Sequence, residues 1–281
     1  ATHLRDIKPG EIVKISHKNF KSTDLPLKVK ATHCSFEPIY FSRPDSLLNH
    51  KTIYDYRKKM GKILAQENPI KADLVIAIPD SGVPAAIGYS QESGIPLELG
   101  LVRNHYVGRT FIEPTQQIRD FRVKLKLNPI RTVLAGKRVV VIDDSLVRGT
   151  TSLKIIRMLR EAGAREIHFR ISSPPITHSC YYGVSTPSRN NLIAAQKSVE
   201  EIKNLVGADS LNYLSKEGLK KLLEEDKTGS YCYACFNGLY PEEIFCKIPA
   251  APVDLSSKVA PGTTAPSHQN LSESKAAQSF Q

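Results

Sequence analysis

Two adjacent carboxylates, Asp143 and Asp144, are the residues of this chain best suited to bind a metal ion or a sugar. They follow four apolar residues, 139–142, which are typical of a buried strand. Side by side they would repel a phosphate group, whereas carboxylate oxygens suit ribose hydroxyls or a hydrated Mg²⁺. The pair therefore indicates a site for a hydroxylated or metal-bound ligand at the end of a strand.

The loop after this pair has groups that could hold a phosphate monoester. Gly149 lets the backbone approach a ligand closely, and Thr150 and Thr151 offer hydroxyls. The start of the following helix presents free N–H groups and the positive end of its dipole. The alternative interpretation is an ordinary acidic turn before a helix that Thr150 caps.

A second loop of the same kind lies earlier in the chain. Residues 76–84 run from an apolar strand through Asp80, Ser81 and Gly82 into a helix. A glycine turn at such a position is also typical of a plain strand-to-helix connection, with Asp80 or Ser81 as the helix cap.

The stretch 103–138 contains nine Lys or Arg residues and two acidic residues, Glu113 and Asp120. It lies between two predicted strands, and its first part, 103–111, is too polar for a core. A long basic loop in a compact domain is usually a lid or a binding loop. A solvated surface loop is the alternative.

Four of the five cysteines have settings that suggest a metal site. Cys232 and Cys235 form a CxxC pair, and Cys34 and Cys180 each lie in a turn-like segment. A CxxC pair can be a redox centre, half of a zinc site or half of an iron–sulfur site. Cys246 has no such setting, so we expect an ordinary thiol there.

Strands and helices alternate along the chain between these motifs. Continuous apolar strands separated by helices indicate an α/β protein with a parallel sheet covered on both faces. In such a sheet ligands bind at the carboxyl ends of the strands, and Asp143 ends its strand. The predicted helices are 47–66, 83–93, 150–162, 198–206 and 215–225, and the predicted strands are 74–78, 97–102, 138–143 and 166–171, after a short strand near residue 12.

Composition excludes several classes of protein. The chain has 281 residues, is 41% hydrophobic and 24% charged, and carries a net charge of +11, which suggests an anionic partner. No apolar run approaches the roughly 20 residues that cross a bilayer. Five cysteines are too few for a secreted disulfide framework, so we expect a reducing compartment.

The string 139–151 resembles the signature with which type I phosphoribosyltransferases bind 5-phosphoribosyl-1-diphosphate (PRPP). Three other segments, 34–46, 173–183 and 231–236, resemble the amidophosphoribosyltransferase family, and the resemblance covers roughly residues 1–248. It implies a type I phosphoribosyltransferase fold in residues 31–248, with a lid loop and a C-terminal helical, cluster-binding extension. Residues 1–30 resemble the end of the family's N-terminal glutaminase domain, and 249–281 are predicted to be a disordered tail.

The resemblance also implies roles for individual residues. The lid would close over the diphosphate. Ser81, Asp143 and Asp144 would be oxygen ligands of one Mg²⁺ per subunit. The residues implied to bind PRPP are Asp80, Ser81, Gly82, Asp143, Asp144, Ser145, Arg148, Gly149, Thr150 and Thr151, and the implied lid residues are Arg103, Tyr106 and Arg109.

In the cluster-bearing branch of this family four cysteines bind a [4Fe–4S] cluster, one per subunit. The matching residues here are Cys34, Cys180, Cys232 and Cys235, whereas Cys246 matches no ligand. A structural cluster is implied, because phosphoribosyl transfer has no redox step. Reduced thiols or a zinc ion are the alternatives for these four residues.

The implied reaction converts glutamine, PRPP and water to 5-phosphoribosylamine, glutamate and diphosphate, the first committed step of purine synthesis. The family's glutaminase nucleophile is a first-residue cysteine. Because the sequence begins with Ala1, we expect these residues to lack that activity. The implied partners are ammonia from glutamine, purine nucleotide inhibitors of the AMP and GMP class, and further subunits of a homo-oligomer, a tetramer in the family. We expect no nucleic acid or membrane partner, and a location in the cytoplasm or the plastid stroma.

Two other functions fit parts of the sequence. A salvage phosphoribosyltransferase would attack PRPP with a nucleobase, but would not need four spaced cysteines. A PRPP-sensing regulator would use the positive charge to bind nucleic acid, and should carry a base-reading module that the sequence does not reveal.

Overall fold

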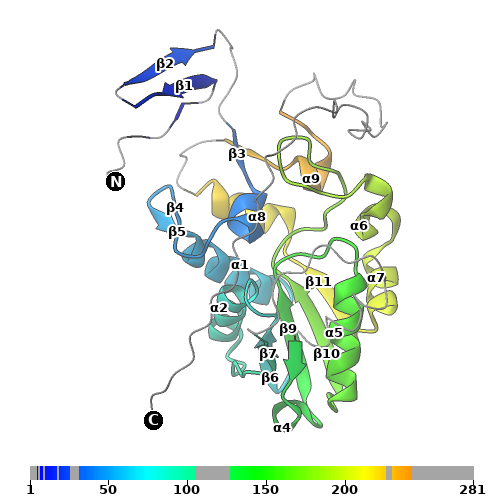
Figure 1. Ribbon diagram of the computed structural model, residues 1–281. Helices are drawn as coiled ribbons and strands as arrows, with labels where there is room; N and C mark the ends of the chain where they lie inside the picture. The colour runs from blue at the N-terminus through cyan, green and yellow to red at the C-terminus, as the bar shows by residue number, and fades with distance from the viewer. Residues whose placement is uncertain are drawn as a thin grey trace, which may run out of the picture. The chain divides into compact units, whose positions relative to one another are not determined.

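The fold is built around a four-stranded parallel sheet of order β11-β10-β9-β6 (Figure 1). A computed structural model describes residues 5, 7–8, 10–17, 19–25, 32–104, 127–225 and 230–241. Because neighbouring strands are parallel, their carboxyl ends share one edge. The strands are β6 (Leu74–Ala77), β9 (Arg138–Asp143), β10 (Glu166–Ile171) and β11 (Ser210–Tyr213).

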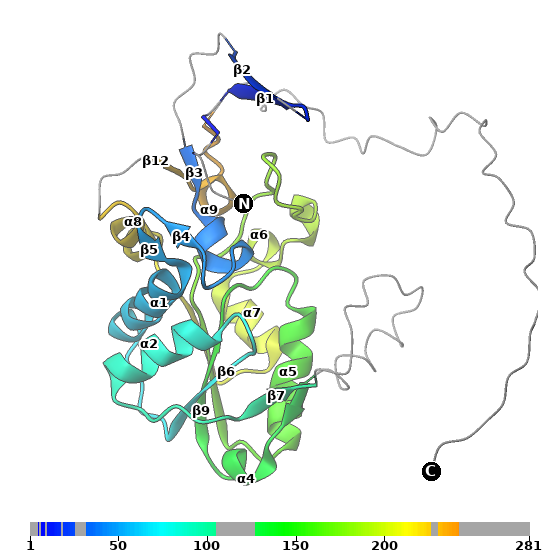
Figure 2. The ribbon, with the colours of Figure 1, turned by 60° about the vertical axis from the view of Figure 1, so that its left-hand side comes forward.

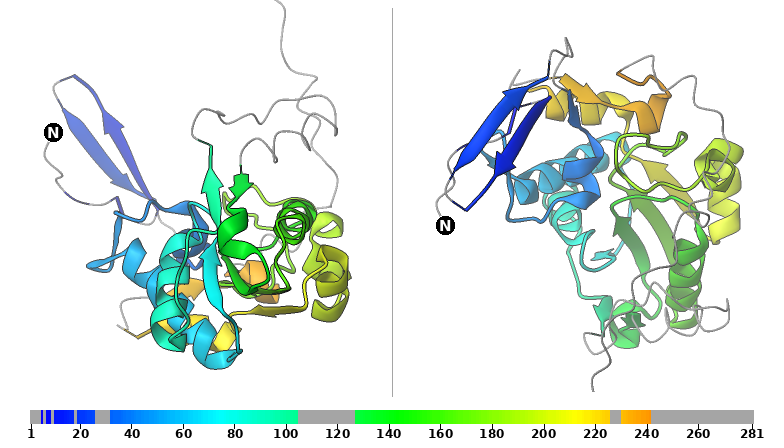
Figure 3. Two further views of the ribbon diagram at one scale, coloured as in Figure 1. Left: turned by 90° about the horizontal axis from the view of Figure 1, so that it is seen from below. Right: turned by 45° about the horizontal axis from the view of Figure 1, so that its top comes forward.

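Helices pack on both faces of this sheet (Figures 2 and 3). Alternate residues of β9 enter two separate cores, Val139 and Val141 on one face and Val140 and Ile142 on the other. Burial on both faces explains why this strand is a continuous apolar run. The first core includes α5 (Thr150–Glu161) and α7 (Val199–Val206), and the second includes α1 (Ile53–Glu67), α2 (Val83–Ser93) and α8 (Lys216–Leu223).

Smaller elements complete the described part of the chain. The antiparallel pairs are β1 (Glu11–Ile15) with β2 (Phe20–Asp24), β4 (Leu47–Leu48) with β5 (Lys51–Thr52), and β7 (Leu101–Arg103) with β8 (Leu127–Pro129). A parallel pair joins β3 (Thr32–Cys34) to β12 (Ser230–Cys232). The short helices are η1 (Glu37–Phe41), α4 (Arg131–Leu134), η2 (Arg189–Asn191), α6 (Ile193–Gln196) and α9 (Ala234–Asn237). None of the helices in the described ranges has the length and apolar content that a membrane crossing needs.

The predicted parallel α/β architecture is confirmed, and several elements match their predicted bounds. Helix 83–93 and the strands 138–143 and 166–171 begin and end where the sequence places them. Helix α5 ends one residue early, with Ala162 as its C-cap and Gly163 in a left-handed conformation.

Two predicted elements were wrong in extent. Residues 47–52 form the pair β4–β5 rather than the first turns of a helix, and α1 begins only after Thr52, whose side chain accepts a hydrogen bond from the Asp55 N–H. The predicted strand 97–102 is shorter, since β7 starts at Leu101 and Leu97 makes only an isolated bridge.

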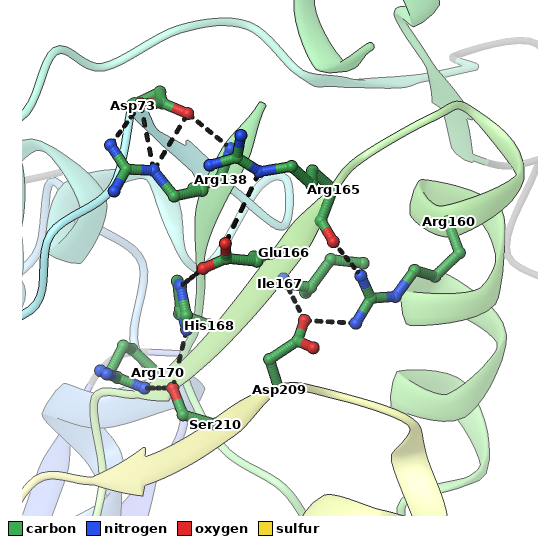
Figure 4. Close-up of polar contacts among 10 residues, drawn as sticks. All are labelled: Asp73, Arg138, Arg160, Arg165, Glu166, Ile167, His168, Arg170, Asp209 and Ser210. Carbon is green, nitrogen blue, oxygen red and sulfur yellow. Dashed lines mark hydrogen bonds and ion pairs between the residues drawn. The ribbon is translucent and has the colours of Figure 1, made fainter. Parts of the chain in front are cut away.

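A network of polar contacts fastens the amino ends of the strands (Figure 4). Asp73, just before β6, accepts hydrogen bonds from the Arg138 backbone N–H and from Arg138 Nη2, both at 2.7 Å. Asp209, just before β11, accepts from the Ile167 N–H at 2.6 Å and pairs with Arg160 of α5. These contacts lie at the edge of the sheet opposite the predicted site.

Candidate active site

The acid pair lies at the carboxyl edge of the sheet, where the sequence predicts it. The Ser172 N–H donates to the Asp143 carbonyl at 2.9 Å, which joins the ends of β9 and β10. The Asp144 N–H donates to Asp143 Oδ1 at 2.9 Å, and Ser145 Oγ donates to Asp144 Oδ1 at 2.5 Å. These hydrogen bonds hold both carboxyls at the end of β9.

Burial raises the pKa of both carboxyls above the ordinary value, and the charge of Asp144 raises the pKa of Asp143 further. Asp144 is only 5% exposed. Hydrogen bonds from Ser145 and Ser81 and the positive charge of Arg57 oppose the rise in its pKa. Two adjacent carboxyls, one buried and one half-buried, favour a bound cation, which would allow both to ionise.

The loop 145–149 leads directly into α5. Gly149 is the N-cap and has a φ of 76°, and a Cβ there would lie 2.8 Å from a side-chain carbon of α6, so the position requires glycine. No side chain caps the helix, so Thr150 is not its cap. Arg148, Thr150 and Thr151 are exposed. An uncapped helix start beside exposed hydroxyls can bind a phosphate group.

The second predicted loop, between β6 and α2, adjoins the first. The Ile78 N–H donates to the Ile142 carbonyl at 2.9 Å. A Cβ at Gly82 would lie only 2.6 Å from that same carbonyl oxygen, so glycine permits the close approach. The Ser81 hydroxyl hydrogen-bonds to Asp144. The structure therefore brings the two loops together around the acid pair.

Arg103, the first of the three predicted lid residues, ends β7 and lies beside the second loop. Its Nη1 donates to Asp80 Oδ2 in an ion pair. The Arg103 side chain is 30% exposed and that of Asp80 is 64% exposed. Tyr106 and Arg109 lie outside the described residues.

Three elements and the loop that contains Cys180 bring the predicted cluster cysteines together. Cys34 ends β3 and lies opposite Cys232 of β12, so its predicted turn-like setting was wrong. Cys235 lies in α9, and its carbonyl accepts hydrogen bonds of 2.9 and 3.1 Å from the N–H groups of residues 177 and 178, close before Cys180 in the chain. All four thiols are free and partly buried. Cys246 lies outside the described residues.

The four sulfurs are near enough to influence one another. Burial raises the pKa of the Cys34, Cys232 and Cys235 thiols, and the charge of Cys180 contributes to each increase. Backbone N–H groups donate to three sulfurs: those of Phe36 and Glu37 to Cys34, that of Ala234 to Cys232, and that of Tyr182 to Cys180 at 3.4 Å. Such donors stabilise a thiolate over a thiol.

In the described part of the chain, no group of three or more His, Cys, Asp or Glu side chains could hold a single metal ion. The acid pair supplies two carboxylates, with Ser81 as a third oxygen. Mg²⁺ commonly binds one or two carboxylates and takes its other ligands from water and substrate phosphates, so this set fits it. In a [4Fe–4S] cubane each of the four irons binds one cysteine thiolate. The four cysteine sulfurs therefore need not surround a single ion.

Sequence reasoning missed Arg57 of α1. It is 3% exposed, donates from Nε to the Pro38 carbonyl at 3.0 Å and from Nη2 to the Ser42 carbonyl at 2.8 Å, and interacts electrostatically with Asp144. It therefore connects the segment after Cys34 to the acid pair. The available signal was a charged residue one turn after Ile53, on the apolar face of the predicted helix.

Comparison with known proteins agrees with this geometry. A family model described as the phosphoribosyl transferase domain matches residues 45–173. The chloroplastic amidophosphoribosyltransferase of Glycine max is 55% identical over 86% of this chain and 42% of its own length. The amidophosphoribosyltransferase of Bacillus subtilis is 51% identical over 87% of this chain and 52% of its own length.

Solved structures show the same likeness. The glutamine PRPP amidotransferase from B. subtilis, complexed with ADP and GMP, matches with a TM-score of 0.76 and 51% identity, over 86% of this chain and 54% of that one. A structure described as the allosteric regulatory enzyme of purine biosynthesis matches with a TM-score of 0.77, over 86% of this chain and 53% of that one.

The fold is that of a type I phosphoribosyltransferase, and residues 45–173 match the phosphoribosyl transferase domain. Over most of its own length the chain is similar to the amidophosphoribosyltransferases. It spans about half the length of the curated relatives it matches.

Proposed function

We propose that this chain is the PRPP-binding transferase part of an amidophosphoribosyltransferase. The whole enzyme would convert glutamine, PRPP and water to 5-phosphoribosylamine, glutamate and diphosphate. The observation that carries the proposal is the meeting of the acid pair with two glycine-containing loops at the carboxyl edge of a parallel sheet. Relatives at 51% identity or more support it.

Different residues of the site would bind different parts of PRPP. The loop Ser145–Thr151, including Arg148, would bind the 5-phosphate at the start of α5, while Asp143 and Asp144 would bind the ribose hydroxyls. The loop Asp80–Gly82 and Arg103 would bind the diphosphate. Ammonia would attack C1 as the C1–O bond to diphosphate breaks, and the new ammonium would lose a proton to water. No enzymic nucleophile takes part.

Mg²⁺ would be held by Asp143, Asp144 and Ser81. When bound, it would neutralise charge on the departing diphosphate. The residues themselves bind the ribose and keep the two loops in register, because the Ser81 hydroxyl bonds to Asp144. Fixed donors and charges around a leaving group account for much of the catalysis in such transfers.

A [4Fe–4S] cluster bound by Cys34, Cys180, Cys232 and Cys235 belongs to the same proposal. The mutual influence of the four sulfurs and the N–H groups aimed at three of them support it. Zinc would satisfy the same four ligands in a closed tetrahedral site, so metal analysis must distinguish the two. The cluster's role would be structural.

Regulation, assembly and location follow as proposals from the relatives. The B. subtilis structure contains ADP and GMP, so we expect purine nucleotides of the AMP and GMP class to inhibit by occupying the phosphate-binding loops. We expect a homo-oligomer, with a tetramer as the family precedent. The Glycine max relative is chloroplastic, which supports a plastid location, and bacterial relatives support the cytoplasm as the alternative.

Diphosphate release tests the proposed function. The 281-residue polypeptide, purified without oxygen, should release diphosphate from Mg²⁺–PRPP when ammonium is supplied at raised pH, where free ammonia is the nucleophile. Turnover with a nucleobase in place of ammonium would favour the salvage enzyme, and no release with ammonium would contradict the proposed function.

A further inference from the structure

One ion pair bridges two segments that are predicted to bind the same ligand group. Arg103 lies at the end of β7, and Asp80 lies in the loop between β6 and α2. Arg103 Nη1 donates to Asp80 Oδ2. The pair therefore brings a positive and a negative side chain of the proposed diphosphate site into contact.

Arg103 has hydrogen-bonding capacity that Asp80 does not use. A guanidinium carries five N–H donors in one plane. Asp80 accepts from Nη1, and Arg103 Nε is buried without a hydrogen-bond partner among the residues that the structure describes. An unsatisfied buried donor is costly, so a second acceptor in this plane would be favoured.

The position of the pair points to the kind of acceptor. Asp80 immediately precedes Ser81, whose hydroxyl bonds to Asp144 of the acid pair. An anion bound to the loop Asp80–Gly82 would thus be near both Arg103, which contacts Asp80, and the acid pair, which contacts Ser81. A diphosphate is an anion that both a guanidinium and Mg²⁺ bind well.

We propose that the Asp80 carboxylate and the diphosphate of the substrate compete for the guanidinium of Arg103. Asp80 is then a positioning residue that holds Arg103 at the loop in the free protein and releases it on binding. The inference rests on the proposed function and gives the Asp80 side chain a role in it. It differs from the direct PRPP contact that the sequence predicts for Asp80.

Breaking the Arg103–Asp80 ion pair costs little free energy. An exposed ion pair is weak, and Asp80 can turn its 64% exposed carboxylate to water when it leaves Arg103. Arginine binds phosphate groups through two parallel N–H bonds, which a single carboxylate contact at Nη1 does not match. The Asp80 charge beside the diphosphate is also repulsive, which favours its departure.

Binding of inorganic pyrophosphate with Mg²⁺, measured by calorimetry on the full chain, tests the competition. Asp80→Asn should lower the dissociation constant by about five-fold, the factor that corresponds to ~1 kcal/mol for an exposed pair. Damage to the loop would weaken binding, so tighter binding cannot arise from misfolding. Asp45→Asn is the matched control, because Asp45 forms an exposed pair with Arg43 outside the site and should leave the constant unchanged.

A second pair of variants separates competition from simple charge repulsion. Arg103→Gln should weaken binding, and adding Asp80→Asn to it should restore little of the loss. Equal tightening with and without Arg103, or weaker binding in Asp80→Asn alone, would overturn the competition. If the unaltered chain binds no Mg²⁺–pyrophosphate and no Mg²⁺–PRPP, the proposed function fails as well. Failure of the competition alone leaves that binding intact.

Discussion

Asp143 and Asp144 occupy positions that lower the stability of the ligand-free protein. Both carboxyls are held at the end of β9 by hydrogen bonds of 2.9 and 2.5 Å, and burial raises the pKa of each. A carboxyl whose pKa is higher in the folded chain than in the unfolded chain destabilises the fold whenever the pH is high enough to ionise it. A bound cation would remove this cost. The acid pair would therefore lower the stability of the free protein and contribute to its affinity for the cation.

Replacing both residues with asparagine should therefore raise the melting temperature of the ligand-free chain near neutral pH. Each unit of raised pKa corresponds to about 1.4 kcal/mol, and ~1 kcal/mol shifts the melting temperature of a chain this size by about 2–4 °C. The gain should shrink as the pH falls toward the ordinary carboxyl value of 3.8, because the unaltered side chains then become protonated. Thermal melts from pH 4 to 8 would show this, and a double variant less stable at every pH would contradict it.

At the residue scale, the sequence predicts groups whose neighbours lie close in the chain. The string 139–151 contains its strand, acid pair, glycine and hydroxyls in order, so residue types alone indicate a phosphate site. Arg57 and the pairing of Asp80 with Arg103 depend on segments tens of residues apart. No local pattern encodes such contacts, because the packing of α1 and β7 creates them.

At the scale of elements, helices α1 and α2 cross with their backbones in contact. A Cβ at Gly61 would lie 1.9 Å from the Ala85 carbonyl oxygen, and one at Gly88 would lie 1.8 Å from that of Lys58. Backbone atoms cannot move aside as a flexible side chain can. The two glycines therefore set the distance between the helices that pack on the second core.

Gly61→Ala or Gly88→Ala should each destabilise the fold by about 1–3 kcal/mol or more, although alanine is the better helix former. Chemical denaturation monitored by circular dichroism would measure the loss. Gln91→Ala, on an exposed position of α2, is the control and should change stability little. Unchanged stability in both glycine variants would show that the helices can separate at no cost.

The cysteine-bearing elements should depend on one another through the proposed cluster. Cys34 and Cys232 end the paired strands β3 and β12, and Cys235 lies in α9. Thiolate ligands must be deprotonated and the site hardly exists in the unfolded chain, so binding of the cluster is coupled to folding.

Cys180→Ser should remove iron and lower the soluble yield, whereas Cys246→Ser should do neither. About four irons and four sulfides per chain are expected from metal analysis of protein purified under nitrogen. Stoichiometric zinc without iron would contradict the cluster and leave the phosphoribosyltransferase interpretation in place.

Regular elements were easier to predict than irregular ones, for physical reasons. The strands 138–143 and 166–171 are buried on both faces and α2 ends at Gly94 in a left-handed conformation, so pattern and turn chemistry agree. Residues 47–52 have helix-like composition, but Asn49 and His50 adopt positive φ values and form a tight β4–β5 turn. The strand β3 could not be predicted because its partner β12 is distant in the sequence.

At the scale of the whole molecule, the parallel sheet and its two loops form the part of the chain for which we propose PRPP binding. The parallel sheet places every strand's carboxyl end at one edge, and the polar network of Figure 4 fastens the opposite edge. The two loops that adjoin the acid pair follow the neighbouring strands β6 and β9. Two such loops beside an acid pair would suit the proposed ligand, PRPP, which carries phosphate groups at both ends of its ribose.

Calorimetric titration of the chain with Mg²⁺–PRPP tests whether the acid pair binds PRPP. The unaltered protein should bind one PRPP per chain, and Asp143→Asn with Asp144→Asn should abolish binding while the circular dichroism spectrum is preserved. Asp45→Asn should bind as the unaltered protein does. Equal affinity in the double variant and the unaltered protein would show that the acid pair is not the PRPP site and would contradict the central claim.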